Sequence, residues 1–136
     1  MLLTIAINVG NTENKLPSGK IIFNNNVIHS GEYNKNTFVL PQIVGTNELS
    51  ISLDNKQDKD TIMKGNQIVE DVFVVVKDLK CEITNDSLND FDTIGTYTTE
   101  KNENLKTFGY LSYNGTYKFV FDYPFFVFKK NKIFYQ

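Results

Sequence analysis

The sequence predicts an all-β domain, built as a two-sheet antiparallel β-sandwich of jelly-roll-like type. Good helix formers are scarce, since the 136 residues include one alanine and no arginine, whereas β-branched and aromatic residues are frequent. Seventeen asparagines, together with aspartates and glycines, supply the residues that turns prefer. These turn residues recur at the spacing of short antiparallel strands, and we find no internal repeat. A helical bundle is therefore disfavoured.

Length, charge and composition narrow the class of protein further. The chain corresponds to a single domain over residues 1–136, with a short C-terminal arm from about residue 129. A net charge of -2 without arginine argues against a nucleic-acid partner. No apolar run approaches the roughly 18 residues that cross a membrane, and the first residues lack the cationic start of a signal peptide, so we expect no membrane partner. The chain has one cysteine and one histidine, which are too few for an internal disulfide or for a zinc site of the Cys/His kind.

Strands are expected wherever alternating or continuous apolar residues lie between turn signals. Pro41 lies inside one such stretch and predicts an edge strand, because proline cannot donate to a ladder. Only residues 87–91 and 100–106 leave room for a helical turn or two. The predicted strands cover residues 2–9, 20–23, 27–30, 37–43, 48–53, 69–83, 93–99, 107–113, 116–122 and 125–128.

The clearest local signal is the dipeptide Asn114-Gly115, the turn that best matches the twist of a two-residue hairpin. We expect Tyr113 to pair with Thr116, and the register of the flanking strands then follows by counting. On this register the core face carries Phe108, Tyr110, Ser112, Tyr117, Phe119 and Phe121, and the mixed opposite face carries Gly109, Leu111, Lys118 and Val120.

A second strong signal is the run Val72-Phe73-Val74-Val75-Val76, which is apolar on both faces of a strand. Such a run is typical of a central strand that is covered on both sides. Left exposed, it would favour aggregation.

Catalysis finds little support in the residue types. A serine, cysteine or threonine nucleophile needs an oriented base, and the only histidine, His29, lies where a strand runs into a turn. We interpret it as an ordinary, partly exposed strand residue. No glycine-rich phosphate motif occurs. The sixteen acidic residues offer many carboxylate pairs, whose spacing in space the sequence does not reveal. We expect the chain not to be an enzyme.

Two loops are rich in oxygen ligands. Asp54, Asp58 and Asp60 lie together between two predicted strands, and residues 85–92 form a second group of Asn and Asp. Loops of this composition bind hard cations such as calcium, although neither matches the EF-hand pattern. The alternative, which we favour, is a solvated loop with Asx turns and no cofactor, because lysines are interleaved with the first group.

The C-terminal segment mixes lysines with aromatics. Apolar residues at a chain end usually mean that the end is held by its own domain or by a neighbouring subunit. We therefore predict an assembly contact at Ile133, Phe134 and Tyr135. The sequons at Asn85 and Asn114 are interpreted as turn residues, not as glycosylation sites.

The second half of the chain resembles a β-sandwich module of virion proteins of large tailed bacteriophages, itself similar to small calcium-dependent xylan-binding modules. The resemblance covers about residues 53–128 and implies a jelly-roll-like fold without catalysis, on a capsid, neck or tail. Residues 125–128 lack the tryptophan frequent in such modules, which weakens a sugar-stacking role. The cation site of the modules would correspond to Asp58 and Asp60. The residues that carry the resemblance are Asp60-Thr61, Ile68 to Leu79, Phe108-Gly109-Tyr110, Asn114 to Tyr117, Phe119, Phe121 and Pro124-Phe125-Phe126.

Two functional hypotheses follow from different classes. The first is a non-enzymatic virion structural protein, a decoration or accessory subunit whose partners are other virion proteins and copies of itself. The second is a carbohydrate-binding adhesion module for a host surface glycan, in which Tyr33, Tyr97 or Tyr113 provides an exposed aromatic platform beside a polar loop. An enzyme is the third and weakest class.

Overall fold

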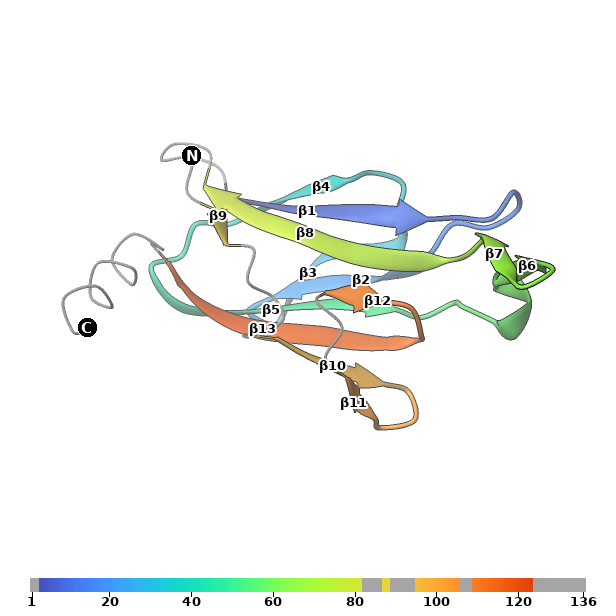
Figure 1. Cartoon of the computed structure of the whole chain (residues 1–136). Helices are drawn as coiled ribbons and strands as arrows, with labels where there is room; N and C mark the ends of the chain where they lie inside the picture. Colours follow the sequence, from blue (N-terminus) through green and yellow to red (C-terminus); the bar gives the residue numbers. More distant parts are fainter. Residues whose placement is uncertain (1–2, 82–86, 89–94, 106–108, 124–136) are drawn as a thin grey trace.

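The computed structural model describes residues 3–81, 87–88, 95–105 and 109–123. These residues form two antiparallel β-sheets packed face to face, with a separate two-stranded hairpin at one end (Figure 1). The only helix among them is the three-residue 3₁₀ turn η1 (Asp58–Asp60). None of the described residues forms a helix long and apolar enough to cross a bilayer. The predicted all-β, two-sheet antiparallel sandwich is confirmed.

The first sheet follows the order β12-β8-β1-β4, and β9 also pairs with β8. The apolar run at residues 72–76 leads into β8, which lies between β1 and β12 as the sequence predicts for a central strand. The edge strand β4 ends directly before Pro41, so the predicted edge position is also confirmed. The bounds are β1 (Leu3–Gly10), β4 (Thr37–Leu40), β8 (Phe73–Cys81), β9 (Ser87–Leu88) and β12 (Tyr110–Leu111).

The second sheet follows the order β11-β10-β13-β5-β2-β3. Its longest pairing joins β13 to β5 along the full length of both strands. The chain crosses between the sheets several times, for example from β3 to β4 and back to β5. The bounds are β2 (Ser18–Phe23), β3 (Asn26–Glu32), β5 (Gly45–Leu53), β10 (Gly95–Thr99), β11 (Asn104–Leu105) and β13 (Gly115–Tyr123).

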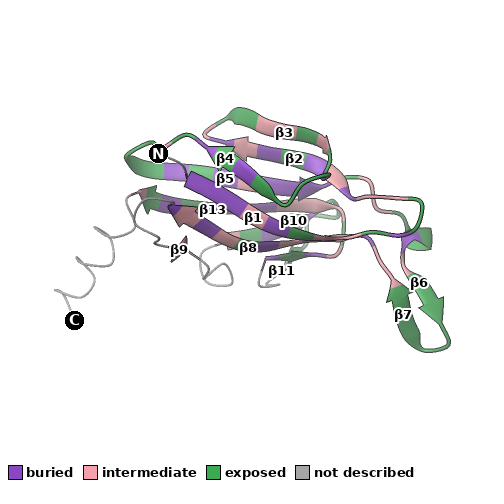
Figure 2. Ribbon diagram, turned by 90° about the horizontal axis from the view of Figure 1, so that it is seen from above, coloured by how far each residue is buried: buried purple, intermediate pink, exposed green. Residues whose placement is uncertain are grey.

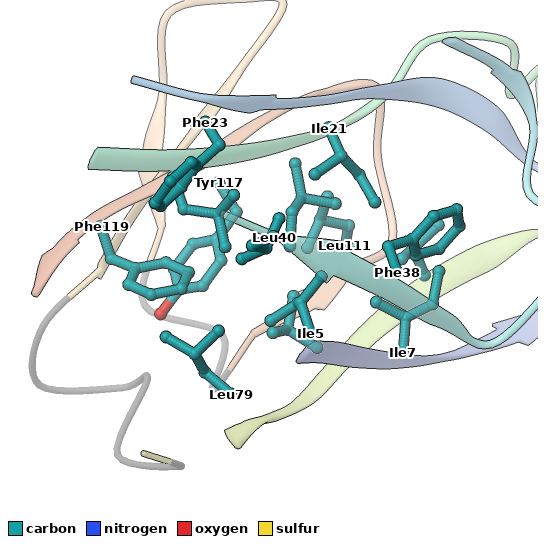
Figure 3. Close-up of a cluster of buried hydrophobic side chains, with 14 of the residues drawn as sticks. Ile5, Ile7, Ile21, Phe23, Phe38, Leu40, Leu79, Leu111, Tyr117 and Phe119 are labelled. Carbon is teal, nitrogen blue, oxygen red and sulfur yellow. The ribbon is translucent and has the colours of Figure 1, made fainter. Parts of the chain in front are cut away.

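The core lies between the two sheets and is formed by alternate residues of each strand (Figure 3). In β13, Tyr117, Phe119 and Phe121 are buried, whereas Lys118 and Val120 between them are exposed. This alternation is the period of two that a strand imposes on its side chains. The predicted core face of β13 is therefore confirmed.

The predicted hairpin around Asn114-Gly115 is wrong. β12 pairs with β8 in the first sheet, whereas β13 pairs with β10 and β5 in the second, so the turn carries the chain from one sheet to the other. Consequently Leu111 is fully buried, while Tyr110, expected in the core, is 38% exposed. The side chain of Asn114 bonds both backbone groups of Lys56, a distant partner that sequence spacing does not reveal. Phe108 lies outside the described residues.

Other strand boundaries also differ from the prediction. The expected strand over residues 69–83 is interrupted at residues 71–72, which separate β7 (Gln67–Glu70) from β8. β6 (Ile62–Lys64) was not predicted. The two candidate helical stretches contain β9 and β11 where the structure describes them, and the strand expected at 125–128 lies outside the described residues.

Candidate functional site

The β6–β7 hairpin projects from one end of the sandwich and pairs with neither sheet (Figures 1 and 2). Its two strands meet through Met63 opposite Ile68 and Lys64 opposite Gln67. Met63 is 52% exposed and Ile68 59% exposed, and Val69 and, to a smaller extent, Ile62 are also exposed. Four large apolar side chains are therefore presented to solvent on one short element.

The base of the hairpin is held by charged groups on the side of η1. The Nζ of Lys15 lies 2.7 Å from Oδ2 of Asp60, and the backbone N–H of Gln57 donates to the same carboxylate at 2.7 Å. Asp60 is buried, and the backbone N–H of Glu13 donates to Oε1 of Glu70 at 3.0 Å. The loop between β1 and β2 is thus tied to both ends of the hairpin segment.

A second ion pair anchors the other side of the base. Nζ of Lys56 lies 2.8 Å from Oδ1 of Asp71 and donates to the backbone carbonyl of Ser112 at 2.7 Å. Asp71 also accepts hydrogen bonds from the hydroxyl of Thr61 and from the N–H of Val72. Both charged side chains of this pair are largely buried, so the pair is well shielded from water. Ion pairs and hydrogen bonds therefore hold both sides of the hairpin base, although the strands of the hairpin are exposed.

The surroundings of Asp60 lower the pKa of its carboxyl group. Burial acts to raise the pKa of this carboxyl, but the hydrogen bonds from Lys15 and Gln57 and the charges of Lys15 and Lys59 outweigh burial. The pKa of Asp60 therefore lies below its ordinary value, and the carboxylate stays ionised at neutral pH.

The three aspartates predicted as calcium ligands do not share one environment. Asp60 faces Lys15, Asp54 accepts from the hydroxyl of Ser52 at 3.2 Å, and Asp58 is exposed. Within the part of the chain that the structure describes, no three His, Cys, Asp or Glu side chains gather into a metal-binding group. In the second acidic loop, residues 85, 86, 89, 90 and 92 lie outside the described residues. The solvated loop without a cofactor stays our prediction, with calcium binding as its alternative, and Lys15 already supplies a positive charge to Asp60.

Two of the three tyrosines proposed as sugar platforms are in the core. The hydroxyl of Tyr33 donates to the backbone carbonyl of Ser52 at 2.5 Å, and burial, followed by the charge of Asp54, raises the pKa of Tyr33. The hydroxyl of Tyr97 contacts the backbone carbonyl of Tyr113 and accepts from its N–H at 2.9 Å. Burial raises the pKa of Tyr97 to about 12. Neither ring is available to stack on a sugar.

Tyr113 is the exception, because 61% of its surface is exposed. It lies on the rim of a pocket of about 450 Å³ next to the hairpin base. A more open hollow of about 700 Å³, which shares Thr99 and Glu100 with this pocket, lies over β10 and β13 and is lined by Thr96, Thr98 and Thr116. The other polar residues of the smaller pocket include Gln57, Asp58, Glu100, Lys101 and Glu103.

His29 has a structural environment. Its ring is half-buried and lies 5.0 Å from the rings of Tyr33 and Phe38. Its Nε2 is 3.1 Å from the backbone carbonyl of Gly31. The contacts of His29 are thus to rings and backbone, in line with the interpretation of an ordinary strand residue. The predicted assembly contact at residues 133–135 lies outside the described residues.

The hairpin and its mounting are the features that sequence reasoning missed. The sequence signal for this hairpin is Gly65, a residue that tight turns prefer. In the structure it has a φ of +65° at the first position of the two-residue turn between β6 and β7. Comparison of the chain with protein-family models, with curated proteins and with solved structures finds no match.

Proposed function

We propose that this chain is a non-enzymatic structural protein of a bacteriophage virion, a capsid, neck or tail decoration or accessory subunit that acts through protein–protein contacts. The observation that carries the proposal is the β6–β7 hairpin, with four exposed apolar side chains on a base held by two ion pairs. Its partners are other virion proteins and copies of itself, and its location is the virion.

The physical argument starts from the instability of such an element in water. An isolated two-stranded hairpin is marginally stable, and grouped exposed apolar side chains usually mark an interaction surface. Here two buried or shielded ion pairs position the hairpin, yet no part of either sheet covers Met63 or Ile68. A partner that covers these side chains removes apolar surface from water, which favours association.

The virion context rests on the sequence resemblance over about residues 53–128, which includes the hairpin and its base. Decoration and accessory subunits act by permanent contacts, and a stable permanent interface buries about 2,000 Å² or more. A projecting element increases the surface that a domain of 136 residues can offer to neighbours.

Particle incorporation tests this proposal. The tagged full chain, produced during infection of the host, should co-sediment with purified virions in a density gradient. Met63→Thr with Ile68→Thr should reduce incorporation strongly, because threonine keeps the strand propensity but removes the apolar contact. Val120→Thr is the matched control, since Val120 is equally exposed but lies on the outer face of β13. Absence of the unmodified chain from particles, or equal incorporation of the hairpin variant, would contradict the proposal.

A second candidate function is a carbohydrate-binding adhesion module, and the specific observation in its favour is Tyr113. An exposed ring beside a polar pocket is the arrangement in which one sugar face stacks on an aromatic while its hydroxyls find hydrogen-bond partners. The pocket carries the carboxylates of Asp58, Glu100 and Glu103 against the ammonium groups of Lys56 and Lys101. This small excess of negative charge favours neutral or amino sugars over acidic ones.

A glycan array separates the two candidates. Under the second, the intact chain binds a defined set of glycans and Tyr113→Ala abolishes the signal. Tyr110→Ala is the control, because Tyr110 is also partly exposed but stacks on Phe73 at 5.0 Å, outside the pocket. Binding that survives Tyr113→Ala, or no binding at all, counts against an adhesion role.

A further inference from the structure

Two exposed apolar features lie at opposite ends of the sandwich. β5 begins at Gly45, immediately after Ile43 and Val44, and ends at Leu53, from which the chain continues through η1 to the hairpin. Nine extended residues span roughly 30 Å. Figure 1 shows the start of β5 at the end of the sandwich away from β6 and β7. The two apolar features therefore cannot cover one another within one molecule.

The end that carries Ile43 and Val44 is called the receiving end, and it also includes Thr46 and Asp122. Val44 is 79% exposed, the highest value among the large apolar residues that the structure describes. The hydroxyl of Thr46 donates to Oδ1 of Asp122 at 2.8 Å across the β5–β13 pairing. The receiving end thus combines an apolar surface with a fixed, exposed carboxylate.

The charges of the two ends are complementary. The hairpin carries Lys64 beside its turn, and the receiving end carries Asp122. Among the described residues, neither takes part in an intramolecular ion pair. The exposed carboxylate Glu48, near the receiving end, is already paired with Lys118 at 3.2 Å. A cation next to one apolar patch and an anion next to the other favour their contact over contact of either patch with itself.

We propose that copies of this chain associate head to tail, with the β6–β7 hairpin of one copy on the receiving end of the next. The inference rests on the proposed function, because it names a second copy as the partner that covers the hairpin. Two different surfaces make the contact heterologous, so the association continues into a ring or a filament and does not stop at a two-fold dimer.

Mixing two disabled variants tests the geometry of the contact. The hairpin variant is Met63→Thr with Ile68→Thr, and the receiver variant is Val44→Thr with Asp122→Asn. Sedimentation velocity over about a hundredfold range of concentration should show oligomers larger than a dimer for the unmodified chain. Each variant alone should be monomeric, and a one-to-one mixture should form a heterodimer that does not grow, because each variant keeps one intact surface. Far-ultraviolet circular dichroism checks that both variants remain folded.

Charge reversal provides a second, independent readout. Lys64→Glu should weaken association by about fivefold at low salt, the size expected for one exposed charge pair, and Asp122→Lys in the same chain should restore it. High salt should reduce the difference between these variants. If Asp122→Lys does not restore the association that Lys64→Glu weakens, the two residues do not meet across the contact, and the proposed pairing is overturned.

The outcomes distinguish this inference from the function on which it rests. Oligomers formed by the receiver variant alone would indicate hairpin-to-hairpin contact and overturn the head-to-tail arrangement. An unmodified chain that stays monomeric, with a hairpin variant that is still lost from particles, would overturn self-association but leave the structural role intact, with another virion protein as the partner. A hairpin variant that incorporates normally would refute the structural role itself.

Discussion

β13 and the β6–β7 hairpin both carry large apolar side chains, but β13 buries most of them and the hairpin leaves them exposed. β13 has neighbours on both sides and places three aromatic rings in the core, whereas the hairpin pairs only with itself and leaves its apolar side chains in water. β13 alternates between buried and exposed residues as a strand on a core does, whereas every residue of β6 and nearly every residue of β7 is exposed. The comparison teaches that position in the sheet, and not residue type, decides whether an apolar side chain stabilises the fold or remains available to a partner.

The largest effect is expected where β13 is most buried. Phe119 lies 5.7 Å from the ring of Tyr117 and 5.9 Å from that of Phe121, and it is almost completely inaccessible. Phe119→Ala should lower the free energy of unfolding by about 3 to 5 kcal/mol, because it removes a buried aromatic and leaves a cavity. Lys118→Ala, one residue away and exposed, should change it by less than about 1 kcal/mol. Urea unfolding measures both, and equal losses would contradict the alternation.

The second-largest loss in the free energy of unfolding is expected at the base of the hairpin. Asp71→Ala leaves the shielded ammonium of Lys56 without its carboxylate, and we expect a loss of about 2 to 4 kcal/mol. Hydrogen exchange of the β6 and β7 amides should increase more than that of β5. If exchange rose uniformly across the sheets, the ion pair would be part of the global core and not a local mounting.

Low pH should weaken the other side of the hairpin's attachment, where Lys15 pairs with Asp60. Because the pKa of Asp60 is lowered in the folded state, its contribution to stability is complete above its ordinary value of 3.8 and is lost as the pH falls through the lower, folded pKa. Urea unfolding between about pH 5 and pH 2 should show this loss, and Asp60→Asn should reduce its slope. Asp58→Asn, at an exposed carboxylate two residues earlier, is the matched control. An unchanged slope for Asp60→Asn would contradict the role of the Lys15 ion pair.

The smallest effect on stability is expected at the hairpin strands themselves. Met63→Thr with Ile68→Thr should change the free energy of unfolding by no more than about 1 kcal/mol, because both side chains are already in water. The same double variant is expected to lose particle incorporation. A large loss of stability would mean that the side chains of the hairpin stabilise the fold, as those of β13 do, and would contradict the distinction drawn between the two regions.

Sequence reasoning identified the features that depend on periodicity. The buried face of Tyr117, Phe119 and Phe121, the central position of β8 and the edge position before Pro41 all follow from local patterns, and all are present. The failure at Asn114-Gly115 has a different origin. A local turn preference of this kind is small compared with the burial of Leu111 and the two hydrogen bonds of Asn114 to Lys56, 58 residues away in sequence.

The candidate sites were harder to predict because exposure is a tertiary property. Tyr33, Tyr97 and Tyr113 are the same residue type in similar strand and turn contexts, yet only Tyr113 reaches solvent. The charged base of the hairpin joins residues 15 and 60, and residues 56 and 71, whose partnership no local spacing indicates. The turn at Gly65 was visible, but the strands on either side are too short to stand out.

The Lys56–Asp71 ion pair also determines how the molecule bears tension. Asp71 leads into β8 of the first sheet, and Lys56 follows β5 of the second. Lys56 also holds Ser112, after β12, and Asn114, before β13. We therefore expect both layers of the sandwich to share a pulling force applied to the hairpin, so that no single edge strand separates first. Through the Lys56–Asp71 ion pair, a force on the β6–β7 hairpin would thus act on the domain as a whole.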